Sequence, residues 1–193
     1  LIKKIASTGK PMIISTGMSS QEEIAEAVEA AKSMGNDHIV LLKCTSTYPA
    51  PPDATHISAI PTLASRFGVM AGLSDHTHGI GVAVASVAFG ARVIEKHFTL
   101  SRADGGVDSA FSLEPAELKA LVEETDRAWR SIGTPELGMR SVEEASSAYR
   151  RSLYIVEDVK PGDVLTPTNL RSIRPGFGLK PKHYEALIGR TVT

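Results

Sequence analysis

The sequence predicts an α/β fold: the C-terminal half of a (β/α)8 TIM barrel, followed by a linker and a small β-rich domain. Apolar runs typical of strands start near residues 12, 39, 69 and 92, and helical patterns separate them. Strands that are apolar throughout and alternate with helices form a parallel sheet with covered faces. A doubly wound sheet fits the same alternation, but no G-x-G-x-x-G motif follows any of these strands, which weakens its dinucleotide-binding form. Four such units are half of the eight in a barrel.

The first unit begins with the apolar run 11–14, which stops at Ser15. Ser20 and Glu23 have the spacing of a capping box, so a helix is expected to start directly after Ser20 and to end near Gly35. Helical periodicity places three apolar side chains on its buried face: Ile24, Val28 and Ala31.

The next three strands are expected at 39–42, 69–73 and 92–95, each followed by polar residues. The segment 81–89, rich in small residues, predicts a tightly packed helix between the last two. Pro115 opens a longer helix. Its expected inner stripe is Leu118, Leu121, Val122 and Trp129.

Composition narrows the possible function classes. With 42% hydrophobic and 22% charged residues, the chain has the content of a soluble globular protein. A net charge of -1 gives no electrostatic reason to expect nucleic acid or an anionic membrane as partner. No apolar run approaches the ~20 residues that cross a bilayer. A single cysteine, Cys44, excludes an intramolecular disulfide and fits a reducing cytoplasm. Because the start is polar, lacks Met and resembles a helix tail, we expect a fragment.

Residues 1–131 are assigned to the half-barrel, 132–150 to a polar linker and 151–193 to the small domain. The linker is only weakly periodic. In the small domain, a strand is expected at 152–156, and further short strands around 164–165 and Ile173.

Polar residues follow all four expected strands. In barrel enzymes the functional residues lie at the carboxyl ends of strands, so the four groups indicate one shared site. These are Ser15, then Thr45 to Tyr48, then Ser74-Asp75-His76, and finally Lys96-His97.

His76 and His97 end neighbouring strands, which lie about 4.8 Å apart, so the two imidazoles can share one divalent cation. The alternative is that each is an ordinary hydrogen-bonded loop histidine, which is the interpretation we adopt for His78. Asp75 could orient a ligand imidazole or cap a helix. Cys44 is more typical of a small buried residue than of a nucleophile.

Ser15, Ser46 and Ser74 place hydroxyl groups on one face beside helix N-termini, which suits a phosphate or carboxylate group. Ordinary N-caps are the alternative, above all for Ser15. A glycine-rich loop, 105–109, follows the fourth strand and places Asp108 over the barrel mouth.

Four ordered motifs together resemble the sialic acid synthase family: STGM (15–18), CTSTYP (44–49), GLSDHT (72–77) and GARVIEKHFTL (90–100). The resemblance runs from about residue 10 to residue 193, and the segment RPGFG (174–178) resembles the family's antifreeze-like (SAF) domain. It implies a transferase that condenses phosphoenolpyruvate with an N-acetylated amino sugar to a nonulosonic acid, as a domain-swapped homodimer.

The resemblance also implies residue roles. His76 and His97 match ligands of Mn²⁺ or Mg²⁺. Tyr48 and Asp108 fall where the sugar is contacted, and the serines fall where phosphoenolpyruvate is held. Arg174 matches an arginine that enters the active site of the partner subunit and meets the N-acyl group of the sugar.

Two departures bear on the acceptor sugar. Ser46 stands where many neuraminate-type members have asparagine, and the loop GGVDSAFSL (105–113) differs from their GPD-type loop. This loop is similar to pseudaminic acid synthases, which implies 2,4-diacetamido-2,4,6-trideoxy-L-altrose as acceptor. An N-acetylneuraminate or legionaminic acid synthase stays open, as do a metal-dependent hydrolase and a non-catalytic carbohydrate-binding module. The family's lysines and glutamate from earlier strands are absent here, so the fragment alone is expected to be inactive.

Overall fold

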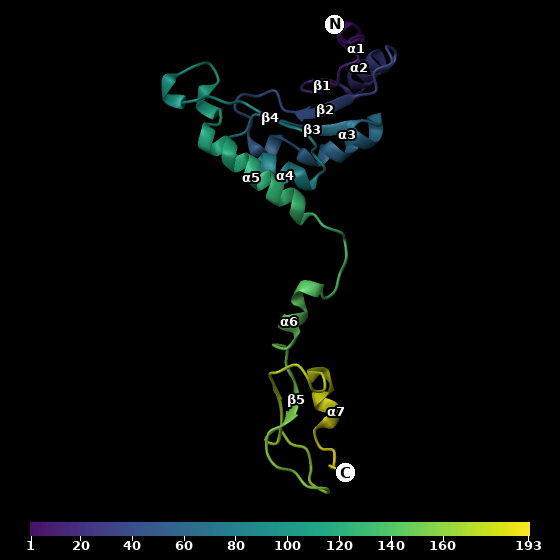
Figure 1. Cartoon of the computed structure of the whole chain (residues 1–193), viewed down its shortest axis with the longest axis vertical. Helices are drawn as coiled ribbons and strands as arrows, with labels where there is room; N and C mark the ends of the chain where they lie inside the picture. The colour runs from purple at the N-terminus through teal and green to yellow at the C-terminus, as the bar shows by residue number, and fades with distance from the viewer. The chain divides into compact units, whose positions relative to one another are not determined.

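The computed structural model describes all residues, 1–193. The chain divides into two compact units, Leu1–Thr134 and Pro135–Thr193. The first unit contains the parallel sheet and its helices (Figure 1). Its strands are β1 Met12–Ser15, β2 Ile39–Cys44, β3 Met70–Asp75 and β4 Ile94–Lys96. Its α-helices are α1 Ile2–Ala6, α2 Gln21–Lys32, α3 Ile60–Phe67, α4 Gly81–Ala88 and α5 Pro115–Ser131. Its 3₁₀ helices are η1 Pro52–Ala54, η2 Ile57–Ala59, η3 Arg102–Asp104 and η4 Ser109–Phe111.

The four strands are parallel, and their order in the sheet is their order in the chain, β1-β2-β3-β4. Parallel crossovers are right-handed, so successive neighbours in this order place every connecting helix on the same face of the sheet. A doubly wound sheet would reverse direction at one point and carry helices on both faces. The arrangement is therefore half of a (β/α)8 barrel, as predicted.

Side-chain alternation divides the sheet into a helix face and an inner face. The helix face holds the core, in which strand residues pack against α2 and α3. Its fully buried members include Ile39, Leu41 and Leu73 among the strands and Ala31 and Ile60 among the helices.

The inner face consists of the alternate strand residues, and toward the amino ends of the strands it is apolar: Val40 is buried there, whereas its register neighbours on the two adjacent strands are exposed. Ile13 is 58% exposed and Met70 is 54% exposed. Toward the carboxyl ends it becomes polar, because Cys44, Ser74 and Glu95 are register neighbours across three strands. One glycine on this face has a packing reason: a Cβ on Gly72 would lie 2.2 Å from the Val93 carbonyl oxygen.

Local sequence signals explain where the helices begin. Ser20 and Glu23 form the predicted capping box of α2, with the Glu23 amide 3.2 Å from the Ser20 hydroxyl. Helix α5 begins at Pro115, with Glu114 and Glu117 forming its capping box. The prediction of the buried residues was correct for α2 and partly wrong for α5.

In α2, Ile24, Val28 and Ala31 are buried as predicted. In α5 only Leu121 is buried, and Leu118 packs against the core in part. The prediction of Val122 and Trp129 as inner residues was wrong, since they are 61% and 47% exposed. The Trp129 ring instead lies under the Arg92 guanidinium, 4.4 Å from the ring centroid. The buried stripe of α5 is therefore narrower than its apolar pattern.

The second unit is built around a small antiparallel pair, β5 Ser152–Ile155 and β6 Leu170–Ile173. Leu153 and Leu170 are its buried apolar residues. An isolated bridge joins Val164 to Thr191, in the region where a further strand was expected. The remaining elements are η5 Ser141–Glu143, α6 Glu144–Ser147, η6 Pro181–His183 and α7 Tyr184–Leu187.

Candidate active site

A pocket of about 430 Å³ opens at the carboxyl ends of the four strands. Six of the eight predicted site residues line it, so the sheet brings together the polar groups that follow its strands, as expected. These six are Ser15, Ser46, Tyr48, Ser74, His76 and His97. The other lining residues are Gly17, Cys44, Glu95 and Lys96.

His76 and His97 lie side by side because Asp75 and Lys96, the residues before them, are register partners at the ends of β3 and β4. Their ring centroids are 5.2 Å apart and the rings are inclined at 72°. His76 is buried and His97 is half-buried. The predicted proximity of the two imidazoles is therefore present.

The His76 ring is held in a defined orientation. Its Nδ1 lies 3.1 Å from the Thr45 carbonyl oxygen. A carbonyl oxygen only accepts, so Nδ1 carries the proton, and Nε2 is left with a lone pair available to a metal ion. Thr45 itself is braced, since its hydroxyl receives a hydrogen bond from the Lys43 ammonium and donates one to the Ala54 carbonyl oxygen. Burial lowers the pKa of Lys43.

His97 has a carboxylate on the equivalent side of its ring. Its Nδ1 lies 3.5 Å from Asp108 Oδ2. The glycine-rich loop thus brings Asp108 to the rim of the site, where the sequence placed it. A carboxylate next to one ring nitrogen favours metal binding by the other. Within the 193 residues, no group of three or more His, Cys, Asp or Glu side chains is arranged to hold a metal, so the chain offers two imidazole ligands.

Aromatic rings form one wall around the histidines. The Tyr48 centroid lies 4.3 Å from that of His76 and 6.0 Å from that of His97. Phe111 lies 5.0 Å from His97 and is buried. Phe111 was not predicted as a site residue, and only its position in the loop that carries Asp108 could have indicated it.

Ser74 and Glu95 are paired inside the pocket. The Ser74 hydroxyl donates to Glu95 Oε2 at 2.7 Å, and Ser74 is buried. Glu95 was predicted only as the end of a strand and not as a site residue. Strand alternation could have revealed it, because Glu95 lies two residues before His97 and one strand away from Ser74.

Asp75 caps no helix and makes no direct bond to either histidine. Helix α4 has Ile80 at its N-cap, so Asp75 caps no helix, and its carboxylate bonds to neither histidine. Instead, Oδ2 lies 2.8 Å from the Lys96 ammonium and Oδ1 accepts from the Thr77 amide at 2.9 Å. Asp75 and Lys96 belong to the helix face, one residue out of phase with Ser74 and Glu95.

The other two serines lie on the far side of the pocket. Ser15 ends β1 and caps no helix, because Ser20 is the N-cap of α2. The Ser46 hydroxyl lies 3.9 Å from Cys44 Sγ. Gly17 allows this close packing, since a Cβ there would lie 2.2 Å from Ser46 Oγ.

Arg174 belongs to the second unit, where it follows β6 and is exposed. Its expected role towards a partner subunit stays a prediction.

Both units of the chain match known protein families. The model of the NeuB family matches residues 1–136, which include the whole sheet and the pocket. The chain belongs to the NeuB family. A SAF domain matches residues 150–193. The antifreeze-like segment expected from RPGFG is therefore present at the predicted place in the chain.

The chain is similar to several synthases. It is 40% identical over 189 residues to a pseudaminic acid synthase of Campylobacter jejuni, covering 98% of this chain and 55% of the relative. It is 38% identical over 195 residues to an N,N'-diacetyllegionaminic acid synthase of the same species, covering 100% of this chain and 58% of the relative. The chain thus spans about half the length of the curated relatives it matches.

Among solved structures, the chain is similar to an N-acetylneuraminic acid synthetase of Leptospira borgpetersenii that was crystallised with citrate. The TM-score is 0.69 at 38% identity, covering 77% of this chain and 52% of that one. No helix of this NeuB-family chain is both long and apolar enough to cross a membrane.

Proposed function

We propose that the protein containing this chain is a transferase that condenses phosphoenolpyruvate with an N-acetylated amino sugar to a nonulosonic acid, releasing phosphate. One observation carries the proposal: in a chain of the NeuB family, two imidazoles lie 5.2 Å apart beside a hydroxyl-lined pocket of about 430 Å³. Such a pocket has the size of a small-ligand site.

The imidazoles suit a divalent cation, Mn²⁺ or Mg²⁺, held by Nε2 of His76 and the equivalent nitrogen of His97. The Nδ1 hydrogen bond of His76 to the Thr45 carbonyl oxygen supports this, because it leaves Nε2 free to bind. The remaining coordination positions fall to water and substrate. A bound cation supplies Lewis-acid polarisation of the open-chain aldehyde of the sugar.

The condensation forms a bond between C3 of phosphoenolpyruvate and the aldehyde carbon, while the C=O π bond of the aldehyde breaks and its oxygen takes up a proton to become a hydroxyl. Water adds at C2, and the C2–O bond to the phosphoryl group breaks, so that phosphate leaves. Ser15, Ser46 and Ser74 offer hydroxyl groups to the anionic substrate. Tyr48 and Asp108, on the rim, are placed to contact the sugar.

Glu95 is the one carboxylate that lines the pocket. Its position beside Ser74 suits it to accept the proton that water loses on adding at C2. The pocket contains no unpaired lysine or arginine, since its only such side chain, Lys96, is paired with Asp75. Cations that neutralise the charge of phosphoenolpyruvate must therefore come from elsewhere in the protein. For the N-acyl group of the sugar, our candidate partner is Arg174 of a partner subunit in a domain-swapped homodimer.

For the acceptor we propose 2,4-diacetamido-2,4,6-trideoxy-L-altrose, which makes the protein a pseudaminic acid synthase. The loop GGVDSAFSL supports this choice, and three of the similar relatives are named pseudaminic acid synthases. A legionaminic or N-acetylneuraminic acid synthase is the second candidate, because similarly related proteins carry those names.

The test is product identification. The full-length protein is incubated with phosphoenolpyruvate, Mn²⁺ and each candidate sugar in turn, and free phosphate and product mass are measured. We expect equal amounts of phosphate and a nine-carbon acid, formed fastest with the altrose derivative. Faster turnover of another sugar would reassign the acceptor. Phosphate release without a nine-carbon acid would reject the synthase and favour a hydrolase.

A further inference from the structure

The Asp75–Lys96 ion pair occupies a place that links the two histidines. Asp75 is the last residue of β3 and Lys96 the last of β4, and the two are register partners. Each therefore immediately precedes one histidine, His76 or His97. Side-chain alternation assigns the pair to the helix face of the sheet, and Lys96 also borders the pocket.

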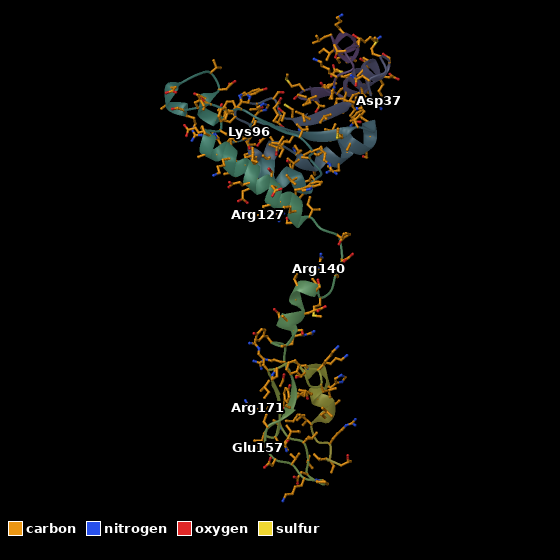
Figure 2. All side chains as sticks on the ribbon, in the orientation of Figure 1. Asp37, Lys96, Arg127, Arg140, Glu157 and Arg171 are labelled. Carbon is orange, nitrogen blue, oxygen red and sulfur yellow. The ribbon has the colours of Figure 1, made fainter.

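The pair is buried and fully bonded. The ammonium and carboxylate are 2.8 Å apart, and their side chains are 3% and 0% exposed; Figure 2 labels Lys96. Lys96 also donates to the Thr77 carbonyl oxygen, and Asp75 also accepts from the Thr77 amide. Both backbone groups of Thr77, the residue after His76, are thus bound to this one pair.

Stability alone is a weak reason for such a pair. Removing two charges from water is costly, and well-packed apolar residues of similar volume are often as stabilising or more so. What charged partners add is a defined geometry, since a buried ammonium and carboxylate lose most of their interaction when they are displaced. Here the geometry that they fix is that of two strand ends.

Further contacts hold the histidines from the pocket side. The His76 carbonyl oxygen accepts from the Ala50 amide at 2.9 Å, and the His97 carbonyl oxygen accepts from the Leu113 amide at 2.8 Å. These bonds tie each histidine to its own neighbouring loop. Two side-chain contacts join the strand end of His76 to that of His97: the Ser74–Glu95 hydrogen bond on the inner face and the ion pair on the helix face. Of these, only the ion pair is formed by the residues that directly precede the histidines.

We propose that Asp75 and Lys96 are positioning residues that set the separation and orientation of the His76 and His97 rings, and thereby the affinity of the site for a divalent cation. The metal part of this inference rests on the proposed function; the ring geometry does not. We assign neither residue a contact with the reacting atoms, because the Lys96 ammonium is held by Asp75 and the Thr77 carbonyl oxygen. The Ser74-Asp75-His76 and Glu95-Lys96-His97 segments then share a pattern, in which one residue faces the pocket, the next locks the strand end, and the third is the metal ligand.

The experiment compares full-length wild type with Asp75→Asn, Lys96→Met and the double variant that carries both changes. Asp75→Asn keeps an oxygen that can accept from the Thr77 amide, so it should fold even if Lys96→Met does not. Ile39→Ala is the matched control. Ile39 is buried on the same helix face, but it lies at the start of β2, away from the carboxyl ends of the strands where the ion pair and the histidines lie. Melting temperature reports stability for every variant.

Two readouts separate the parts of the inference. Histidine ¹⁵N spectra of the metal-free protein report ring environment and tautomer, and Co²⁺ titration followed by visible absorption reports metal affinity. We expect altered His76 and His97 signals and a Kd for Co²⁺ raised about tenfold or more in the pair variants, as for other residues that orient metal ligands. Ile39→Ala should lose stability with unchanged signals and Kd.

Unchanged histidine signals and Kd in Asp75→Asn and the double variant, with only a lower melting temperature, would overturn the inference and leave a purely stabilising pair. If wild type binds no Co²⁺, the metal assignment of the proposed function fails instead. In that case the metal-free spectra still decide whether the pair positions the rings.

Discussion

Side-chain alternation decides which strand-end residues reach the pocket. Ser74 and Glu95 point to the inner face and pair there, whereas Asp75 and Lys96, one residue further, point to the helix face. Ser74, Asp75 and His76 were grouped as one polar segment, because the sequence does not show which of the alternating side chains faces the pocket. The two histidines escape this ambiguity because they follow the strands.

Ser74 gives a prediction at this scale. Ser74→Ala removes a hydroxyl that faces the pocket and holds Glu95, so KM for phosphoenolpyruvate should rise about tenfold, the effect of one hydrogen bond near a charge. Steady-state kinetics of the full-length protein measure it. Ser86→Ala is the matched control: Ser86 is also buried, but its hydroxyl bonds to Ala83 within α4. A KM that does not change in Ser74→Ala would remove Ser74 from the substrate site.

The elements themselves were largely predictable. All four strands and helices α2, α4 and α5 lie where apolar runs, the Ser20 capping box, the small-residue segment 81–89 and Pro115 predicted them, with boundaries shifted by a few residues. The apolar runs did not decide the strand order, because a doubly wound sheet fits the same alternation of strands and helices. The exposure of Val122 and Trp129 was not predictable. An apolar stripe shows which residues a helix can bury, but it does not show how much of that stripe the neighbouring elements cover.

Ser20→Ala tests the cap of α2. The Ser20 hydroxyl accepts from the Glu23 amide, so its loss should lower the free energy of unfolding by about 1 kcal/mol. Ser19→Ala, which removes a neighbouring hydroxyl with no such bond, should change it by less than about 0.5 kcal/mol. Chemical denaturation measures both. Equal effects of the two changes would contradict the assigned cap.

Glu117 links α5 to the loop that carries Asp108. Bonding to Arg102 and to the Glu114 amide lowers the pKa of Glu117 below its ordinary 4.5. A lowered folded-state pKa gives stability that is present above pH 4.5 and is lost as the pH falls through the folded value. Glu117→Gln should therefore lower the melting temperature at pH 7, with the difference from wild type shrinking below pH 4.5. A difference that is independent of pH would reject the ion pair as its source.

At the scale of the whole molecule, the inner face of the half-barrel is the unusual feature. Ile13 and Met70 are exposed on it, and β1 and β4 are edge strands. Unpaired edges beside apolar surface promote association. The parallel order of the four strands brings the histidines together at one end of the sheet. Because four strands do not close a barrel, these apolar side chains of the inner face stay exposed.

The isolated chain 1–193 should therefore self-associate. Sedimentation velocity should show its average mass rising with concentration, and Ile13→Asn combined with Met70→Asn should reduce that rise. Val142→Asn, which changes an exposed apolar residue outside the inner face, is the control. A chain that stays monomeric at all concentrations would contradict this expectation.

The central claim is that His76 and His97 hold the divalent cation of a synthase. Activity and Co²⁺ binding of full-length His76→Ala and His97→Ala, measured beside His78→Ala, test it most directly, because His78 is an exposed histidine of the same loop. The account predicts that each of the first two loses metal binding and more than about a hundredfold in kcat/KM, since transition-state charge is no longer stabilised, while His78→Ala stays within about twofold of wild type. Metal-dependent activity at the wild-type level in His97→Ala would contradict it.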